Sequence, residues 1–243
     1  MLGLPEEVSV ALFDLDGVLT TTATLHTTAW GETFDAFLAE RAKQDAVAGE
    51  DLRPFTEQDY LDHVDGRPRD DGVRGFLASR GITVDDATVD RLAQDKNDRF
   101  TAALQRNGVT PYPDAVDYLT AARDAGLRIA VVTSSKNGAA VLAAAGLDGF
   151  PEQRVDGNTI VAEGLRGKPA PDGFLRGAEL MGVPAANAAV FEDAISGVQA
   201  GAAGHFGAVI GIDRTGGRQT EAMTQAGATR VVADLNELLA EGQ

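Results

Sequence analysis

The second half of this sequence alternates short apolar segments with helical ones, and this alternation restricts the fold more than any other feature. Segments with the length and composition of buried strands occur at residues 127–133, 188–191, 206–212 and 229–232. Segments with helical spacing of apolar residues occur at 113–125, 137–145, 171–181, 194–203, 217–226 and 234–240. Strands that alternate with helices predict a parallel sheet with helices on both of its faces, and therefore an α/β fold.

A further strand is predicted near the N-terminus, and two aspartates follow it. The run Val8-Ser9-Val10-Ala11-Leu12-Phe13 is apolar on both faces, so we expect it in the centre of the sheet. Because side chains alternate along a strand, Asp14 and Asp16 leave its end on roughly the same side. Paired carboxylates in that place can hold a hard cation and still offer one oxygen as a nucleophile. The alternative is a strand that simply runs into an Asp-Gly turn.

The segment between this first strand and the later alternation contains no strand pattern. A small, polar, hinge-like stretch over residues 20–24 is followed by helical patterns at 26–43, 57–64, 71–79 and 85–105. Residues 44–58 are polar and mixed, and we interpret them as a loop. A chain of 243 residues exceeds one typical domain, so this helical block is interpreted as an insertion or a second domain.

Composition excludes several classes of function. The net charge of −16 argues against a nucleic-acid partner, and the absence of cysteine excludes thiol catalysis, disulfides and cysteine-based zinc sites. An anionic substrate would require a metal or local Lys and Arg residues to reverse the sign of the field. No apolar run approaches transmembrane length and no leader pattern precedes the first strand, so we expect a cytoplasmic protein with no membrane partner.

Polar residues also follow several later strands of the predicted sheet. The strand ending at residue 132 leads into Thr133, Ser134, Ser135, Lys136 and Asn137, whose hydroxyl, amide and N–H groups suit an anion. Lys168 precedes a proline, which favours a pinned, extended backbone. Glu192 and Asp193 end another strand and would complete an oxygen-only cation site with Asp14. An ordinary helix cap and a surface Lys-Pro turn are the alternatives for the first two groups.

These four groups resemble, in order, the four sequence motifs of the haloacid dehalogenase superfamily of phosphotransferases. Over nearly its whole length the chain is similar to the β-phosphoglucomutase-like subgroup. The resemblance implies a Rossmann-like core formed by residues 1–20 and 106–243, with an all-helical cap domain inserted at residues 21–105. This agrees with the helical block derived from the apolar pattern.

The resemblance also implies roles for the core residues. Asp14 would be the nucleophile that becomes an aspartyl phosphate, and Asp16 would be the general acid and base. Lys168 would neutralise developing charge. Thr133 would bind the transferring phosphoryl group, assisted by Ser134, Ser135, Lys136 and Asn137. The metal would be Mg²⁺, held by Asp14, the backbone carbonyl of Asp16, Glu192 and Asp193.

The cap would carry the selectivity for substrate. Its similarity to the mutase subgroup lies in three segments, which begin with His26, Gly66 and Lys96. By resemblance, His26 would contact Asp16 and the sugar, and Lys96 would line the sugar pocket. Arg69 would grip the phosphate that is not transferred, with Trp30 and Gly66 also at the substrate. The alternatives are a histidine on the surface of a helix and basic side chains in solvent.

The function implied is interconversion of β-D-glucose 1-phosphate and glucose 6-phosphate through an aspartyl phosphate. Glucose 1,6-bisphosphate would be the bound intermediate and the activator, and we expect a monomer. The alternatives are a Mg²⁺-dependent sugar-phosphate phosphatase with the same nucleophile and a non-catalytic protein that binds sugar phosphates. The non-catalytic alternative is disfavoured by the intact set of Asp14, Asp16, Lys168 and Asp193, because a binding protein needs no nucleophile beside an acid.

Overall fold

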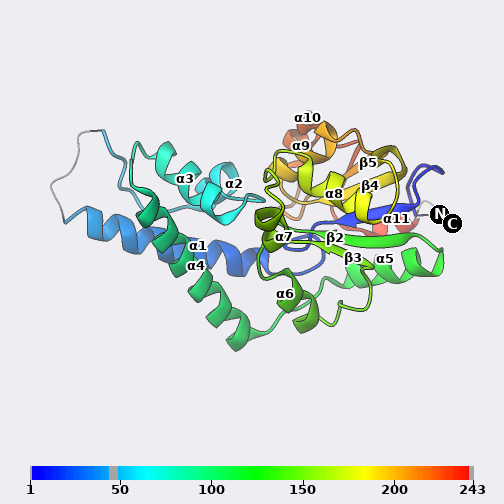
Figure 1. The fold of residues 1–243 in the computed structure, drawn as a ribbon, viewed down its shortest axis with the longest axis horizontal. Coiled ribbons are helices and arrows are strands. Elements are labelled where there is room, and N and C mark those ends of the chain that lie inside the picture. The colour runs from blue at the N-terminus through cyan, green and yellow to red at the C-terminus, as the bar shows by residue number, and fades with distance from the viewer. Residues whose placement is uncertain (1, 44–48, 241–243) are drawn as a thin grey trace. The chain divides into compact units, whose positions relative to one another are not determined.

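The computed structural model describes residues 2–43 and 49–240, which form two compact units (Figure 1). One unit comprises Met1–Thr21 and Val109–Gln243, and the other comprises Thr22–Gly108. The second unit is therefore an insertion into the first. The sequence predicted boundaries after residues 20 and 105.

The two connections to the inserted unit lie side by side at their origin in the first unit. The backbone N–H and the hydroxyl of Thr21 both donate to the carbonyl of Thr110, at 3.0 and 3.1 Å. Thr20 and Pro111 form an isolated antiparallel bridge next to it. The insertion thus leaves and rejoins the first unit at one short antiparallel pair.

The first unit is built on a six-stranded sheet in which every strand pairing is parallel. The strand order is β3-β2-β1-β4-β5-β6. All four residues of β1 are buried, and a strand without a polar face takes an interior place in a sheet. This confirms the predicted α/β fold and the central position of the first strand. The strands are β1 (Val10–Phe13), β2 (Arg128–Val132), β3 (Gln153–Val155), β4 (Ala188–Glu192), β5 (Ala208–Ile212) and β6 (Arg230–Val232).

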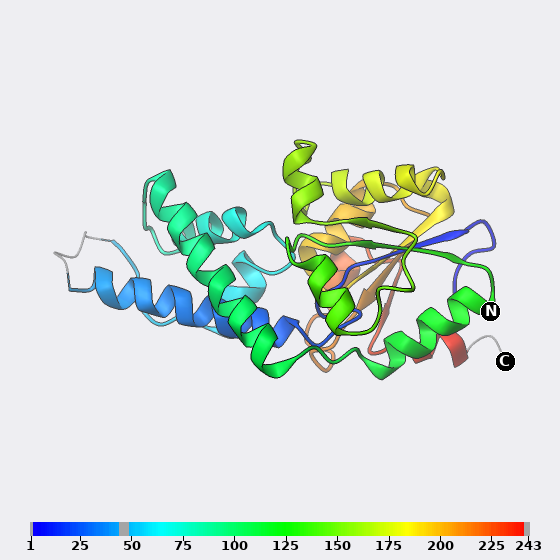
Figure 2. The same cartoon turned by 60° about the horizontal axis from the view of Figure 1, so that its bottom comes forward.

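Helices cover both faces of this sheet (Figure 2). On one face, Val10 and Leu12 pack in an apolar cluster that includes Phe174 and Val198. On the other face, the ring of Phe13 packs against Phe191 and Tyr118, with centroids 4.3 and 6.1 Å apart. The alternation of β1 side chains therefore divides the core into two layers. The helices are α5 (Pro113–Asp124), α6 (Gly138–Ala144), α7 (Gly157–Ala162), α8 (Asp172–Leu180), α9 (Ile195–Ala203), α10 (Thr220–Ala226) and α11 (Asn236–Ala240).

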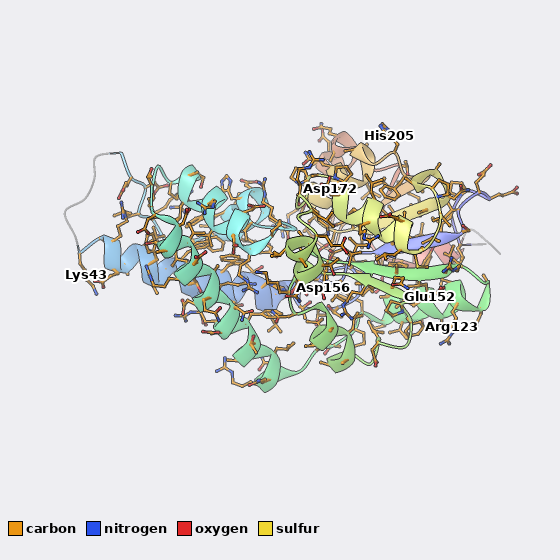
Figure 3. The ribbon with its side chains drawn as sticks, in the orientation of Figure 1. Lys43, Arg123, Glu152, Asp156, Asp172 and His205 are labelled. Carbon is orange, nitrogen blue, oxygen red and sulfur yellow. The ribbon has the colours of Figure 1, made fainter. Side chains whose placement is uncertain are left out.

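Residues 155–160 form a stretch for which the sequence pattern predicted neither a strand nor a helix. It contains the end of β3 and the start of α7. Asp156 stands between them, and its carboxylate accepts the backbone N–H groups of Asn158 and Thr159 at 2.9 and 3.1 Å (Figure 3). An edge strand of three residues with two exposed side chains has no apolar pattern to reveal it.

Within its described residues, the secondary structure of the inserted unit consists of helices joined by loops. Its core gathers Trp30 and Phe34 of α1, Val73 and Phe76 of α3, and Leu92 of α4. Residues 49–56 of the predicted loop contain neither helix nor strand, while its residues 44–48 lie outside the described residues. The helices are α1 (Ala23–Arg41), α2 (Glu57–His63), α3 (Arg69–Ser79) and α4 (Asp86–Asn107). Among the helices of the described chain, none combines the length and apolar character that crossing a membrane requires.

A buried arginine holds the segment before α2 and the end of α3 together. The side chain of Arg80 is 1% exposed and donates to the Asp59 carboxylate at 2.8 Å and to the Arg53 carbonyl at 2.9 Å. Asp59 in turn accepts the backbone N–H of Thr56 at the start of α2. Because both charged groups are buried, neither can lose its partner without a large desolvation cost.

We expect Arg80→Met to destabilise the protein by about 3–5 kcal/mol, since it removes the buried cation beside the Asp59 carboxylate and leaves only Arg53, whose side chain is 55% exposed, as a charged partner. Chemical denaturation followed by circular dichroism measures the effect. Arg74→Met, within α3, is the matched control, because the Arg74–Asp86 ion pair is solvent-exposed and its loss should change stability little. Equal loss in the two variants would contradict a structural role for the buried pair.

Candidate active site

The two aspartates of the first motif stand where β1 ends. Asp14 is buried, and its backbone N–H donates to the Phe191 carbonyl at 2.9 Å, which continues the ladder to β4. The loop that follows is closed by a bond of 2.8 Å from the Gly17 N–H to the Thr20 carbonyl. Gly17 has a φ of +96°, which a glycine adopts without strain. A tight turn therefore holds Asp16 directly beside the nucleophile candidate.

Lys168 joins the ends of two strands through its ammonium group. Its Nζ lies 2.5 Å from Asp14 Oδ1 and 2.5 Å from Glu192 Oε1, and its side chain is 6% exposed. The second Glu192 oxygen accepts the Ala194 N–H at 2.9 Å, where the chain enters α9. The structure therefore excludes a surface Lys-Pro turn, because one buried cation is shared by two buried carboxylates.

Burial and neighbouring charges shift the protonation of this pair. Burial raises the pKa of Asp14 to about 8, with Glu192 and Asp16 acting in the same direction and Lys168 opposing them. The pKa of Lys168 is also raised, because the attraction of Asp14 and Glu192 outweighs the effect of its burial. Lys168 is thus held as a cation. A divalent cation at Asp14 would favour the carboxylate form.

Thr133 links the second motif to the first. Its hydroxyl donates to Asp16 Oδ2 at 3.3 Å and accepts the Ser135 N–H at 3.1 Å. The Ser135 hydroxyl accepts the N–H of Asn137, which stands at the N-terminus of α6 and makes no side-chain cap bond. Lys136 is exposed. The structure thus brings Thr133 to Asp16, while phosphate binding by residues 134–137 stays a prediction.

Asp193 lies against the turn of the first motif. A Cβ atom placed on Gly17 would stand 1.8 Å from Asp193 Oδ2, so this carboxylate occupies the space that a larger residue would fill. Asp14, Asp193 and the Asp16 carbonyl offer only hard oxygen donors, which suit a divalent cation that keeps water and substrate oxygens as further ligands. Glu192, also predicted as a ligand, has Lys168 and Ala194 as partners in the structure.

No group of three or more His, Cys, Asp or Glu side chains within the described ranges is arranged to hold a metal by itself.

The inserted unit contains a second cluster of predicted residues. Lys96 Nζ lies 2.5 Å from His26 Nδ1, and the His26 ring stacks on Phe100 with centroids 4.1 Å apart. The same ammonium stands 5.1 Å from the centroid of Trp30 and 4.9 Å from that of Phe100. Lys96 is 4% exposed. The structure therefore excludes a solvated lysine, and it packs the half-buried His26 against Lys96 and Phe100.

Arg69 is connected to this cluster by a hydrogen bond to Asn97 of α4. Its Nη2 donates to Asn97 Oδ1 at 2.8 Å, and Asn97 follows Lys96 in the chain. Burial lowers the pKa of Arg69, with Asp70 and Asp98 opposing that effect. Gly66 turns the chain with a φ of +71° just before α3 begins at Arg69.

Phe100 was missed by the sequence analysis. Its position four residues after Lys96 on a helix was the available signal, because residues so spaced share one face.

Comparison with known proteins agrees with this arrangement of fold and motifs. A family model described as haloacid dehalogenase-like hydrolase matches residues 8–205, and the chain belongs to this family. Within it, the chain is 52% identical over 250 residues to the β-phosphoglucomutase of Mycobacterium tuberculosis, covering 98% of this chain and 94% of that relative.

Two solved structures share the fold. A hydrolase from Pseudomonas syringae superposes with a TM-score of 0.79 at 24% identity, covering 96% of each chain. The β-phosphoglucomutase of Clostridium difficile superposes with a TM-score of 0.76 at 22% identity, covering 95% of this chain and 93% of that one. The family and the mutase relatives imply that the enzyme uses a divalent metal.

Proposed function

We propose that this chain is a β-phosphoglucomutase, an enzyme that interconverts β-D-glucose 1-phosphate and glucose 6-phosphate. The observation that carries this proposal is the 52% identity to a curated β-phosphoglucomutase over nearly the full length of both proteins. The buried contact between Asp14 and Lys168 supports it, because phosphoryl transfer depends on positioning and charge neutralisation. The alternative of a sugar-phosphate phosphatase is not favoured by the same similarity.

The reaction would begin with the phosphoryl group on Asp14. The 6-hydroxyl of β-glucose 1-phosphate attacks the phosphorus, the bond to the Asp14 oxygen breaks, and Asp16 takes the hydroxyl proton. The glucose 1,6-bisphosphate so formed then presents its other phosphate. Asp14 attacks that phosphorus, the bond to the C1 oxygen breaks, and Asp16 returns the proton to that oxygen. Glucose 6-phosphate leaves, and the phosphoryl group is again on Asp14.

Other residues of the core would support both steps. Lys168 neutralises negative charge that the transferring group brings next to Asp14. The Thr133 hydroxyl, which donates to Asp16 in the structure, would orient that carboxylate and contact the phosphoryl oxygens. Mg²⁺, held by Asp14, the Asp16 carbonyl and Asp193 with Glu192 behind them, would supply charge neutralisation and alignment of the phosphoryl oxygens. A cytoplasmic location and a monomeric state stay predictions.

The inserted unit would supply the second phosphate site. A bisphosphate intermediate needs one phosphate at Asp14 and another held elsewhere, and the guanidinium of Arg69 can bind a phosphate through two parallel bonds. His26, Trp30 and Lys96 would contact the sugar, with Gly66 shaping the turn before α3.

The proposal is tested by supplying the purified protein and Mg²⁺ with β-glucose 1-phosphate and a trace of glucose 1,6-bisphosphate. Glucose 6-phosphate and free phosphate are followed together, with α-glucose 1-phosphate as the control. Rapid glucose 6-phosphate formation from the β anomer, with little free phosphate, is the expected result. Free phosphate without glucose 6-phosphate would make the protein a phosphatase.

We expect Gly17→Ala to weaken Mg²⁺ binding by about 10- to 100-fold, since the new methyl group would displace the Asp193 carboxylate. Isothermal titration calorimetry measures the affinity. Gly216→Ala is the control, because Gly216 also has a positive φ of +76° but has no atom within 4 Å of an added Cβ. Unchanged affinity in Gly17→Ala would argue against Asp193 as a ligand.

We expect Arg69→Ala to reduce mutase turnover by about 100-fold, because a bidentate phosphate contact is lost. Slow release of free phosphate should continue, since Asp14 and Lys168 are untouched. Arg67→Ala, two residues earlier, is the matched control and should retain mutase turnover. A parallel loss of both activities in Arg69→Ala would speak against a separate second phosphate site.

A further inference from the structure

An arginine outside the four motifs contacts the loop that carries Asp16. Arg214 follows the end of β5, and its Nε and Nη2 atoms donate to the carbonyls of Gly17 and Val18, at 3.4 and 3.2 Å. These carbonyls come directly after Asp16 in the chain. The guanidinium therefore binds the turn from the side of β5, although 197 residues separate it from Gly17.

The same guanidinium is fixed on its other sides by groups that do not belong to the loop. The Asp114 carboxylate pairs with Nη2 at 2.8 Å, and the ring of Tyr112 lies 4.0 Å from the guanidinium carbon. Asp114 is itself anchored, because its Oδ2 accepts the N–H of Leu235 at 2.8 Å. The side chains of Arg214 and Asp114 are 17% and 10% exposed. A flat, charged group held on three sides is a rigid support.

Tyr112 also ties this support to the first motif. Its backbone N–H donates to the Leu19 carbonyl at 3.0 Å, so the loop from Asp16 to Thr20 is flanked by both Tyr112 and Arg214. Inside the loop, the Gly17 N–H closes the turn to Thr20, but the Gly17 and Val18 carbonyls point to the arginine. Without it, the position of the turn would depend on fewer bonds.

We propose that Arg214 is a positioning residue that holds the turn bearing Asp16 in register with Asp14. This inference rests on the proposed function, because it assigns to Asp16 the proton transfer of the mutase reaction. The contacts that the structure gives Arg214 are with Gly17, Val18, Asp114 and Tyr112, so it acts on Asp16 through the turn. Its loss should displace the acid and base more than the nucleophile, which is held by β1 and by its bond to the Phe191 carbonyl.

The prediction separates two reactions that share the nucleophile. Transfer between glucose oxygens needs a proton delivered to a poor leaving group, and general acid–base catalysis of this kind contributes about 10²- to 10⁴-fold. Phosphorylation of Asp14 by 4-nitrophenyl phosphate releases a weakly basic phenolate, which leaves without a proton. A displaced Asp16 should therefore slow the first reaction and spare the second.

The test compares Arg214→Met with the wild-type protein in both reactions. The variant should lose about 10- to 100-fold in kcat for glucose 6-phosphate formation, as a displacement of about 1 Å can cause. The first-turnover release of 4-nitrophenolate, measured by rapid mixing in the presence of Mg²⁺, should stay within about threefold of wild type on the same grounds. Equal losses in the two reactions, or no loss in either, would overturn the proposal.

Two further variants keep the test decisive. Arg214→Lys retains a cation for Asp114 but cannot bond both carbonyls and also stack on Tyr112. We expect a smaller loss of glucose 6-phosphate formation in this variant, with 4-nitrophenolate release again spared. It therefore tests the proposal even if Arg214→Met does not fold. Arg128→Met is the control. Like Arg214, Arg128 pairs with a carboxylate, that of Glu152, and donates to a backbone carbonyl, that of Met181. It stands at the first residue of β2, at the other end of this strand from Thr133. Arg128→Met should leave both rates unchanged.

The outcome also distinguishes this inference from the proposed function. If the wild-type protein forms no glucose 6-phosphate, the mutase assignment fails. Phosphate release from the same sugar phosphate then becomes the reaction with the poor leaving group. In that case, Arg214→Met should slow phosphate release from the sugar phosphate more than it slows the first-turnover release of 4-nitrophenolate.

Discussion

Asp14→Asn is expected to reduce glucose 6-phosphate formation by at least about 10³-fold, because an amide cannot replace the carboxylate that forms the aspartyl phosphate. The substitution preserves shape, and Lys168 keeps Glu192 as its partner, so the fold should persist. Incubation with a phosphoryl donor should label the wild-type protein and leave the variant unlabelled, as intact-protein mass spectrometry would measure.

The control for this substitution is Asp124→Asn at the exposed end of α5, which should retain both turnover and labelling. Full turnover in Asp14→Asn would exclude Asp14 as the nucleophile. It would therefore contradict both the mutase and the phosphatase mechanism, because each uses this aspartate as its nucleophile. Labelling of the variant at another residue would identify that residue as the nucleophile and would leave the proposed reaction possible.

Lys168→Met is expected to affect stability and turnover together. Removing the ammonium leaves Asp14 and Glu192 buried beside each other without a cation, which should cost about 3–5 kcal/mol of unfolding free energy. Turnover should fall by at least about 10²-fold, because the cation 2.5 Å from Asp14 Oδ1 would no longer neutralise the charge of the transferring group. Thermal unfolding and the glucose 6-phosphate assay measure the two effects.

Two substitutions separate charge from position at this site. Lys168→Arg keeps the cation and should recover most of the stability, but its larger planar group should not restore turnover. Lys43→Met removes an exposed lysine two residues after the end of α1 and should change neither quantity (Figure 3). Wild-type turnover in Lys168→Arg would mean that any cation suffices between Asp14 and Glu192.

The sequence predicted the sheet well because its strands are apolar and its helices periodic. Residues 188–191 and 128–132, for example, lie in β4 and β2, within the predicted segments. The failure at β3 has a physical reason: three residues at the edge of a sheet, two of them exposed, bury too little apolar surface to leave a pattern. This segment becomes a strand because it pairs with β2, and the residue pattern within one segment does not show which strand it will pair with.

The motif residues at strand ends could be predicted, but their contacts could not. Parallel strands bring Asp14 and Glu192 to one edge of the sheet, so their proximity follows from topology. Lys168 lies 2.5 Å from both carboxylates, but it comes from a loop that is 24 residues from Glu192 and 154 residues from Asp14 in the chain, so this contact could not be predicted. Arg214 was missed for a similar reason, because its partners are backbone carbonyls, and any residue type supplies those.

The short antiparallel pair formed by Thr20, Thr21, Thr110 and Pro111 has an evolutionary consequence. An insert that departs and returns at neighbouring points can be exchanged for one of another length or sequence while the strands on either side keep their register. Under the proposed function, in which the inserted unit contacts the sugar, selection on substrate preference can act on that unit separately from selection on the phosphoryl-transfer residues. On the same proposal, proteins that share this core can differ in the sugars they recognise through changes confined to the insert.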